Sequence, residues 1–112
     1  LTLYLDKNWH LTVNGAPGGP QAVTATEFAA QIARGRGHTK LLEHSREILS
    51  VSIDPKANTA IAESREKTSR RYKDRQITMV ERSTDNIELR NQRLVILKST
   101  STVEKFEEIT VP

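Results

Sequence analysis

The second half of the chain alternates hydrophobic and polar residues with a period of two, which predicts long β-strands. A first strand is expected over 44–53, where Leu49, Val51 and Ile53 alternate with serines, and the segment 54–58 supplies a turn. Three further strands are predicted over about 59–69, 75–90 and 94–106. Because only short turns separate them, we expect an antiparallel meander.

The first half has a mixed pattern. Its apolar residues predict the end of a helix over the first residues, a change near 6–8 and a short strand over 9–13. The Gly- and Pro-rich segment 15–20 is expected to be a surface loop. Thr24 and Glu27 match a capping box, so a helix of about three turns should begin at Ala25. It should end at Gly35 and Gly37, where left-handed residues are needed.

These elements predict an α+β fold, with one curved antiparallel sheet of about four to five strands packed on a short helix. A chain of 112 residues is expected to form a single domain over 1–112. The sequence begins without Met inside an apolar element, so an N-terminal segment and any targeting signal could be missing from it.

Composition narrows the possible functions. The chain has no cysteine, which excludes disulfides, thiolate zinc ligands and a cysteine nucleophile. A net charge of +3 and five aromatic residues do not favour nucleic-acid binding. No stretch approaches the roughly 20 apolar residues that span a bilayer. We therefore expect no membrane segment, and the compartment stays open with the cytoplasm slightly favoured.

The order of the elements resembles the nuclear-transport-factor-2-like superfamily, in particular its SnoaL-like and ketosteroid-isomerase-like members, which share the cystatin-like α+β fold. The resemblance is carried by 4–10, the loop 15–20, the capped helix from Thr24, the strand 47–53 and the two long strands meeting at 90–93. It implies a cone-like shape, a pocket and a homodimer formed through the sheet. Members of the family usually open with a long N-terminal helix, which could be missing from this chain. Some members are isomerases, hydrolases or cyclases and others only bind, so the resemblance implies no single activity.

The pocket that this resemblance implies would be lined by residues from both halves of the chain: Tyr4, Trp9, His10, Phe28, Ile32, Met79 and Glu81. His10 could position or protonate a ligand, and an inward-facing Glu81 could act as a general acid or base. These two are weak catalytic candidates. The alternatives are that only one of Trp9 and His10 faces the core, and that Val80 points inward while Glu81 is exposed.

The remaining sequence patterns give weaker indications of a functional site. His38 and His44 are six residues apart, which fits neither a helical pair nor a short zinc spacing, so no metal or other cofactor is expected. The basic residues between Arg65 and Arg75 could attract anions or simply protect a strand edge. No P-loop, GxGxxG, GxSxG or HExxH motif occurs.

The leading interpretation is a domain that binds a small hydrophobic or anionic molecule and forms a homodimer. The second is an isomerase-like or hydrolase-like enzyme with an acid or base in the pocket. The third, from a different class, is a protein-interaction module that uses the sheet or the basic hairpin.

Overall fold

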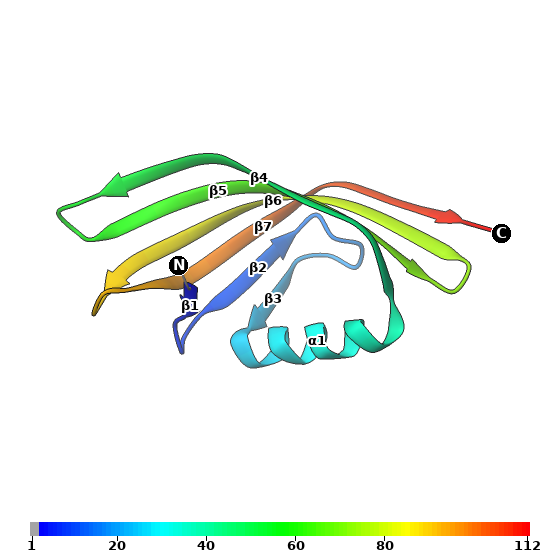
Figure 1. Ribbon diagram of the computed structural model, residues 1–112, viewed down its shortest axis with the longest axis horizontal. Helices are drawn as coiled ribbons and strands as arrows, with labels where there is room; N and C mark the ends of the chain where they lie inside the picture. Colours follow the sequence, from blue (N-terminus) through cyan, green and yellow to red (C-terminus); the bar gives the residue numbers. More distant parts are fainter. Residues whose placement is uncertain (1–2) are drawn as a thin grey trace.

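A computed structural model describes residues 3–112 of the chain, and residues 35–38 only by their backbone. Seven strands and one helix follow one another in this part of the chain (Figure 1). Their bounds are β1 (Leu3–Leu5), β2 (His10–Asn14), β3 (Gln21–Thr24), α1 (Ala25–His38), β4 (Lys40–Asp54), β5 (Thr59–Tyr72), β6 (Arg75–Arg90) and β7 (Arg93–Thr110).

All seven strands join one sheet in the order β3-β2-β7-β6-β5-β4, with β1 paired to β7. The long strands β4 to β7 form the antiparallel meander that the sequence predicts. However, β1 and β2 run parallel to β7, so the sheet is mixed. The expected count of four to five strands is wrong because β1 and β3 have only three and four residues, too few to show alternation.

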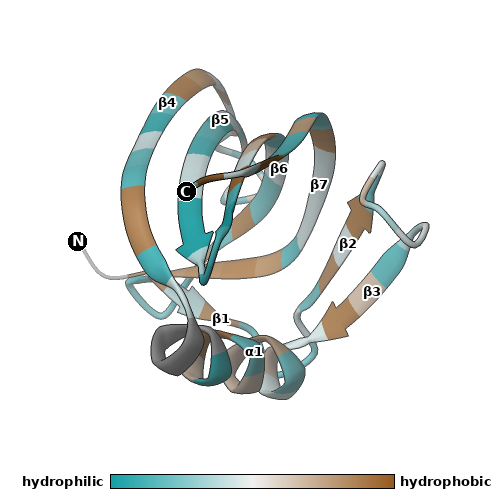
Figure 2. Ribbon diagram, turned by 90° about the vertical axis from the view of Figure 1, so that its right-hand side faces the viewer, coloured by the Kyte–Doolittle hydropathy of each residue, from teal (hydrophilic) through white to brown (hydrophobic). Residues whose placement is uncertain are grey.

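The sheet is bent along its length. The strand β4 has 15 residues and β7 has 18, about three times the usual strand length. Two register shifts interrupt the β4–β5 ladder and two more the β6–β7 ladder. Such bulges bend a strand and increase its twist. The long strands accordingly arch over α1, as Figures 1 and 2 show from two directions.

The helix begins as the capping box predicts. The Glu27 backbone N–H donates to Thr24 Oγ1 at 3.2 Å, and the Thr24 N–H donates back to Glu27 Oε1 at 3.4 Å. The helix continues to His38, three residues past its expected end at Gly35. The left-handed helix end expected at Gly35 and Gly37 is therefore wrong, because both glycines lie within α1.

The expected helix end over the first residues is wrong for the part described, because β1 is a strand. The strand β1 pairs with β7 through Leu3, Tyr4 and Leu5. The chain then turns, with the Asn8 N–H donating to the Asp6 carboxylate at 3.0 Å. The Trp9 N–H donates to the Asp6 carbonyl at 2.9 Å, which closes this turn. Local hydrogen bonds to Asp6 therefore take the place of a helical turn.

Few apolar side chains are buried in the described part of the chain, namely Trp9, Val23 and Val95. The radius of gyration is 15.6 Å, whereas a compact domain of this length has about 13 Å. Large apolar side chains of β4 remain exposed, up to 72% for Ile53. The sheet is thus open, and α1 lies under only part of the arch (Figure 2).

We predict that Gly15→Ala destabilises the protein more than Gly18→Ala. Both glycines have positive φ, +77° and +94°, so either alanine should cost about 1–2 kcal/mol in backbone strain. Only at Gly15 would the new Cβ also meet a backbone atom, the Val103 carbonyl oxygen at 3.0 Å. Urea denaturation of both variants measures the difference, and equal losses would contradict the predicted close contact with β7.

Candidate ligand-binding site

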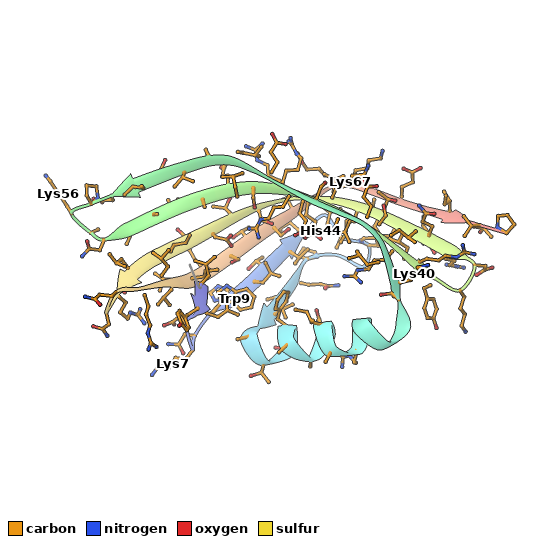
Figure 3. All side chains as sticks on the ribbon, viewed as in Figure 1. Lys7, Trp9, Lys40, His44, Lys56 and Lys67 are labelled. Carbon is orange, nitrogen blue, oxygen red and sulfur yellow. The ribbon has the colours of Figure 1, made fainter. Side chains whose placement is uncertain are left out.

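Trp9 identifies the side of the sheet that faces α1. Its ring packs edge-on against Phe28 of the helix, with centroids 5.4 Å apart and planes at 66°. The indole Nε1–H donates to Ser99 Oγ on β7 at 3.1 Å. Trp9 is 5% exposed and lies between the sheet and the helix (Figure 3). Ser99 therefore lies on the helix-facing side.

The strand register places further polar residues on that side. In the β6–β7 ladder, Asp85 is opposite Ser99, Ser83 is opposite Ser101 and Glu81 is opposite Val103. Directly opposed residues in an antiparallel pair share a face of the sheet. Alternate residues of β6 therefore present two carboxylates, those of Glu81 and Asp85, and the Ser83 hydroxyl toward the helix side.

A chain of polar contacts crosses this face from Trp9 to β4. Ser99 accepts from Trp9 and donates its own proton to Asp85 Oδ1. Arg46 Nη2 lies 3.5 Å from Asp85 Oδ2 and donates to Ser64 Oγ at 3.3 Å. Ser99 and Ser64 are buried, and the Asp85 side chain is 15% exposed. Four strands thus contribute to fixing one partly buried carboxylate.

A second series of hydrogen bonds holds the Glu81 side chain in place. Ser83 donates to Ser101 Oγ at 3.2 Å, and Ser101 donates to Glu81 Oε2 at 2.6 Å. Ser101 is 2% exposed and Glu81 is half-buried. A carboxylate that accepts a short hydroxyl bond is held in one orientation, while its remaining lone pairs stay available. A ligand on this side would meet two oriented acceptors.

The seven residues expected to line a pocket do not all come together. Trp9 contacts Phe28, and Met79 lies two residues before Glu81 in β6 and shares its face. Ile32 is exposed on α1, and His10 is exposed at the start of β2. Tyr4 lies in β1 beside Val95, with the Arg93 guanidinium over its ring at 5.1 Å.

Sequence reasoning missed several polar members of this arrangement, namely Arg46, Ser64, Asp85, Ser99 and Ser101. One signal was present, because Asp85 follows Glu81 by four residues in an alternating strand and so shares its face. The sequence offered no such signal for the serines. Which carboxylate a strand serine can hydrogen-bond depends on the cross-strand register. That register passes two bulges that the sequence does not mark.

The described part of the chain shows neither a metal site nor a membrane-spanning helix. No group of three or more potential metal ligands occurs there, and the His38 side chain lies outside it. Instead, His44 Nε2 lies 2.9 Å from Glu66 Oε2. Among the described residues, no helix is long and apolar enough to cross a membrane.

The basic hairpin between Arg65 and Arg75 is largely paired. Arg65 Nε donates to Glu104 Oε1 at 2.7 Å, and Lys67 Nζ lies 3.6 Å from Glu43. Arg75 pairs with Glu108. The remaining arginines donate to oxygens of the chain, Arg70 to Thr39 and Arg71 to the carbonyls of Lys73 and Pro112. Carboxylates therefore offset the charges of Arg65, Lys67 and Arg75, whereas Arg70 and Arg71 are held by uncharged oxygens and keep their positive charge.

The sequence matches no protein-family model, and no curated protein matches it. Solved structures do. A nuclear-transport-factor-2-like protein from Cytophaga hutchinsonii is similar over 89% of this chain and 76% of its own, with 14% identity and a TM-score of 0.67. A ketosteroid isomerase-like protein from Erwinia carotovora atroseptica is similar over 91% and 76%, with 11% identity and a TM-score of 0.67.

These neighbours identify the architecture as an α+β cone in which one curved sheet wraps a helix. More specifically, the chain has the nuclear-transport-factor-2-like fold. The resemblance noted in the order of the sequence elements is thereby confirmed at the level of the fold. Function must be argued from the site itself, since this fold carries many activities.

We predict that Trp9→Phe lowers the free energy of unfolding by about 1–3 kcal/mol, because the Ser99 hydroxyl loses a donor and a buried ring shrinks. Tyr72→Phe is the matched control, since Tyr72 is exposed and its change should stay within about 0.5 kcal/mol. Urea denaturation measures both. Equal stabilities for the two variants would show that the indole contact does not secure the helix side.

We also predict an acid-sensitive component of stability from Glu104. The adjacent Arg65 guanidinium lowers the pKa of Glu104, first through its hydrogen bond and then through its charge. A lowered folded-state pKa gives stability that is present above the unfolded pKa of about 4.3 and is lost as pH falls through the folded pKa. Urea denaturation between about pH 5 and pH 2 should therefore show a smaller loss for Glu104→Gln than for the wild type. Glu107→Gln serves as the control, and an unchanged pH profile for Glu104→Gln would refute the prediction.

Proposed function

We propose that the protein binds a small molecule on the helix-facing side of the sheet, between Trp9 and the carboxylates of Asp85 and Glu81. The observation that carries this proposal is that both carboxylates are held by buried serines on the concave side. Partly buried carboxylates are unfavourable unless they are hydrogen-bonded. Asp85 is joined through Ser99 to the Trp9–Phe28 pair, and an oriented polar group next to aromatic side chains is typical of a recognition surface.

The hydrogen bonds favour a ligand that donates. Glu81 uses Oε2 to accept from Ser101, and its Oε1 has no hydrogen bond within the described residues. Asp85 already accepts from Ser99 and lies near Arg46, yet each of its oxygens has capacity for a further donor. Hydroxyl or amino groups of a ligand would complete these contacts.

The charges on the helix-facing side also favour a ligand that donates hydrogen bonds. Glu66 is opposite Glu81 in the β5–β6 ladder, so the helix-facing side carries three carboxylates with Asp85. Arg46 and His44 are the basic groups that contact them. This balance favours a neutral or cationic ligand over the anionic one considered from the sequence. Trp9 and Phe28 would contact its apolar part.

An enzyme is the second candidate, and one observation favours it. Glu81 is half-buried and its carboxylate is oriented by Ser101 at 2.6 Å, which suits a general base that takes a proton from a bound substrate. The expected homodimer stays a prediction, and light scattering on the purified protein would test it.

The proposal predicts that Asp85→Asn and Glu81→Gln weaken ligand binding. The test is a thermal-shift screen of neutral and cationic molecules that carry hydroxyl or amino groups on an apolar frame, followed by calorimetric titration of the hits. Loss of a charge-assisted hydrogen bond should weaken binding by about ten- to a hundredfold. Ketonic substrates added to the screen, with exchange of the proton next to the carbonyl followed by NMR, would detect the second candidate function.

Glu63→Gln is the matched control. Glu63 pairs with Arg82 at 2.8 Å, and strand alternation places it on the side of the sheet away from Asp85. Its substitution should leave binding unchanged. Hits that bind all three variants as tightly as the wild type would refute a site on the helix-facing side.

A further inference from the structure

An open groove of about 620 Å³ lies where β1 meets the turn between β6 and β7. Its walls combine charged and apolar side chains from three segments of the chain. The residues that matter for its chemistry are Tyr4, Asp6, Lys7, Arg90, Arg93 and Val95. Figure 3 shows Lys7 at this end of the molecule.

The groove lies on the opposite side of the sheet from the site described above. Residues of β6 alternate regularly, so Glu88 points away from the side that Asp85 occupies. Val95 is opposite Glu88 in the β6–β7 ladder, and Tyr4 is opposite Val95 in the β1–β7 ladder. The two surfaces therefore share no side chain.

One wall of the groove is held by ion pairs of Arg90 with two carboxylates. Arg90 Nη1 donates to Asp6 Oδ1 at 2.9 Å, and Arg90 Nε donates to Glu88 Oε1 at 2.8 Å. The guanidinium thus bridges the β1–β2 turn and the end of β6. Its charge is offset by two carboxylates, so Arg90 shapes the groove and does not itself supply free positive charge.

Lys7 and Arg93 supply the free positive charge of the groove. Neither has an ion pair within the described residues, although both line the groove. The Arg93 guanidinium stacks over the Tyr4 ring at 5.1 Å, a contact that restrains the group without occupying its N–H donors. The groove therefore holds an oriented guanidinium and a lysine above a floor that includes buried Val95.

We propose that this groove binds a small aromatic or aliphatic monocarboxylate. The Arg93 fork matches a carboxylate in two-point geometry, Lys7 adds a second positive charge, and the Tyr4 ring and Val95 contact the apolar part of the ligand. The carboxylates of Asp6 and Glu88 offset two of the three cations, so one surplus positive charge distinguishes this groove from the carboxylate-rich side that faces the helix. The anionic ligand considered from the sequence fits here.

Benzoate is the probe, added to 15N-labelled protein and followed by two-dimensional NMR. We expect saturable shifts of the amides of 4–7 and 93–95. Arg93→Gln and Lys7→Gln should each weaken benzoate binding by about tenfold, the effect of one lost charge-assisted contact. Arg93→Lys, which keeps the charge and loses the fork, should lie between Arg93→Gln and the wild type.

Three controls make the outcome decisive. Lys56→Gln removes an exposed lysine on the β4–β5 turn and should bind benzoate like the wild type (Figure 3). Inorganic phosphate and benzyl alcohol test charge and apolar contact separately, and each should bind more weakly than benzoate. Glu81→Gln should leave benzoate binding intact, which separates this site from the helix-facing one.

The proposal is overturned if benzoate shifts no amide at this end of the sheet. It is equally overturned if Lys56→Gln weakens binding as much as Lys7→Gln, since the attraction would then be diffuse. Phosphate binding as tight as benzoate would contradict the role given to Tyr4 and Val95.

Discussion

The hydrogen bond from the Trp9 indole to Ser99 joins three parts of the chain that are distant in sequence. It secures the segment before β2 to the middle of β7, while the same ring packs against Phe28 of α1. With so few apolar side chains buried among the described residues, this contact substitutes for a large core in holding the helix under the sheet. Ser99 in turn orients Asp85, so the polar chain across the arch depends on Trp9.

The two sides of the sheet differ in how their charges are satisfied. On the helix-facing side, buried serines support carboxylates and leave acceptor capacity unused. On the other side, Arg65 with Glu104 and Arg82 with Glu63 form exposed ion pairs, which are typically worth little in stability. The helix-facing side therefore offers acceptors to a ligand, whereas the middle of the other side is covered by paired charges.

Local chemistry explains what the sequence could predict. The Thr24–Glu27 capping box lies within one turn of chain, and the strand over 75–90 is bounded by turn residues at both ends, so both were predicted correctly. The Asn91–Gln92 turn has positive φ at both residues, as tight hairpins require.

Long-range pairing explains what could not be predicted. The three residues of β1 find their place only by pairing with β7 some ninety residues later. The partnership of Ser99 with Asp85 likewise depends on a register that passes a bulge near Ile87. In the sequence, Glu81 follows the apolar Ile77 and Met79 on one face of the strand, whereas Asp85 lies among other polar residues.

The bulges of β4 have a consequence for association between molecules. In the described part of the chain β4 pairs only with β5, so its other edge presents free backbone donors and acceptors along 15 residues. A flat strand of that length with exposed Ile48, Val51 and Ile53 would invite edge-to-edge aggregation. The irregularities between Leu41 and Glu43 and between Ile48 and Ser50 divide this edge into short pieces that a straight strand cannot follow. The bends that shape the arch therefore also protect the protein from polymerising through its own sheet.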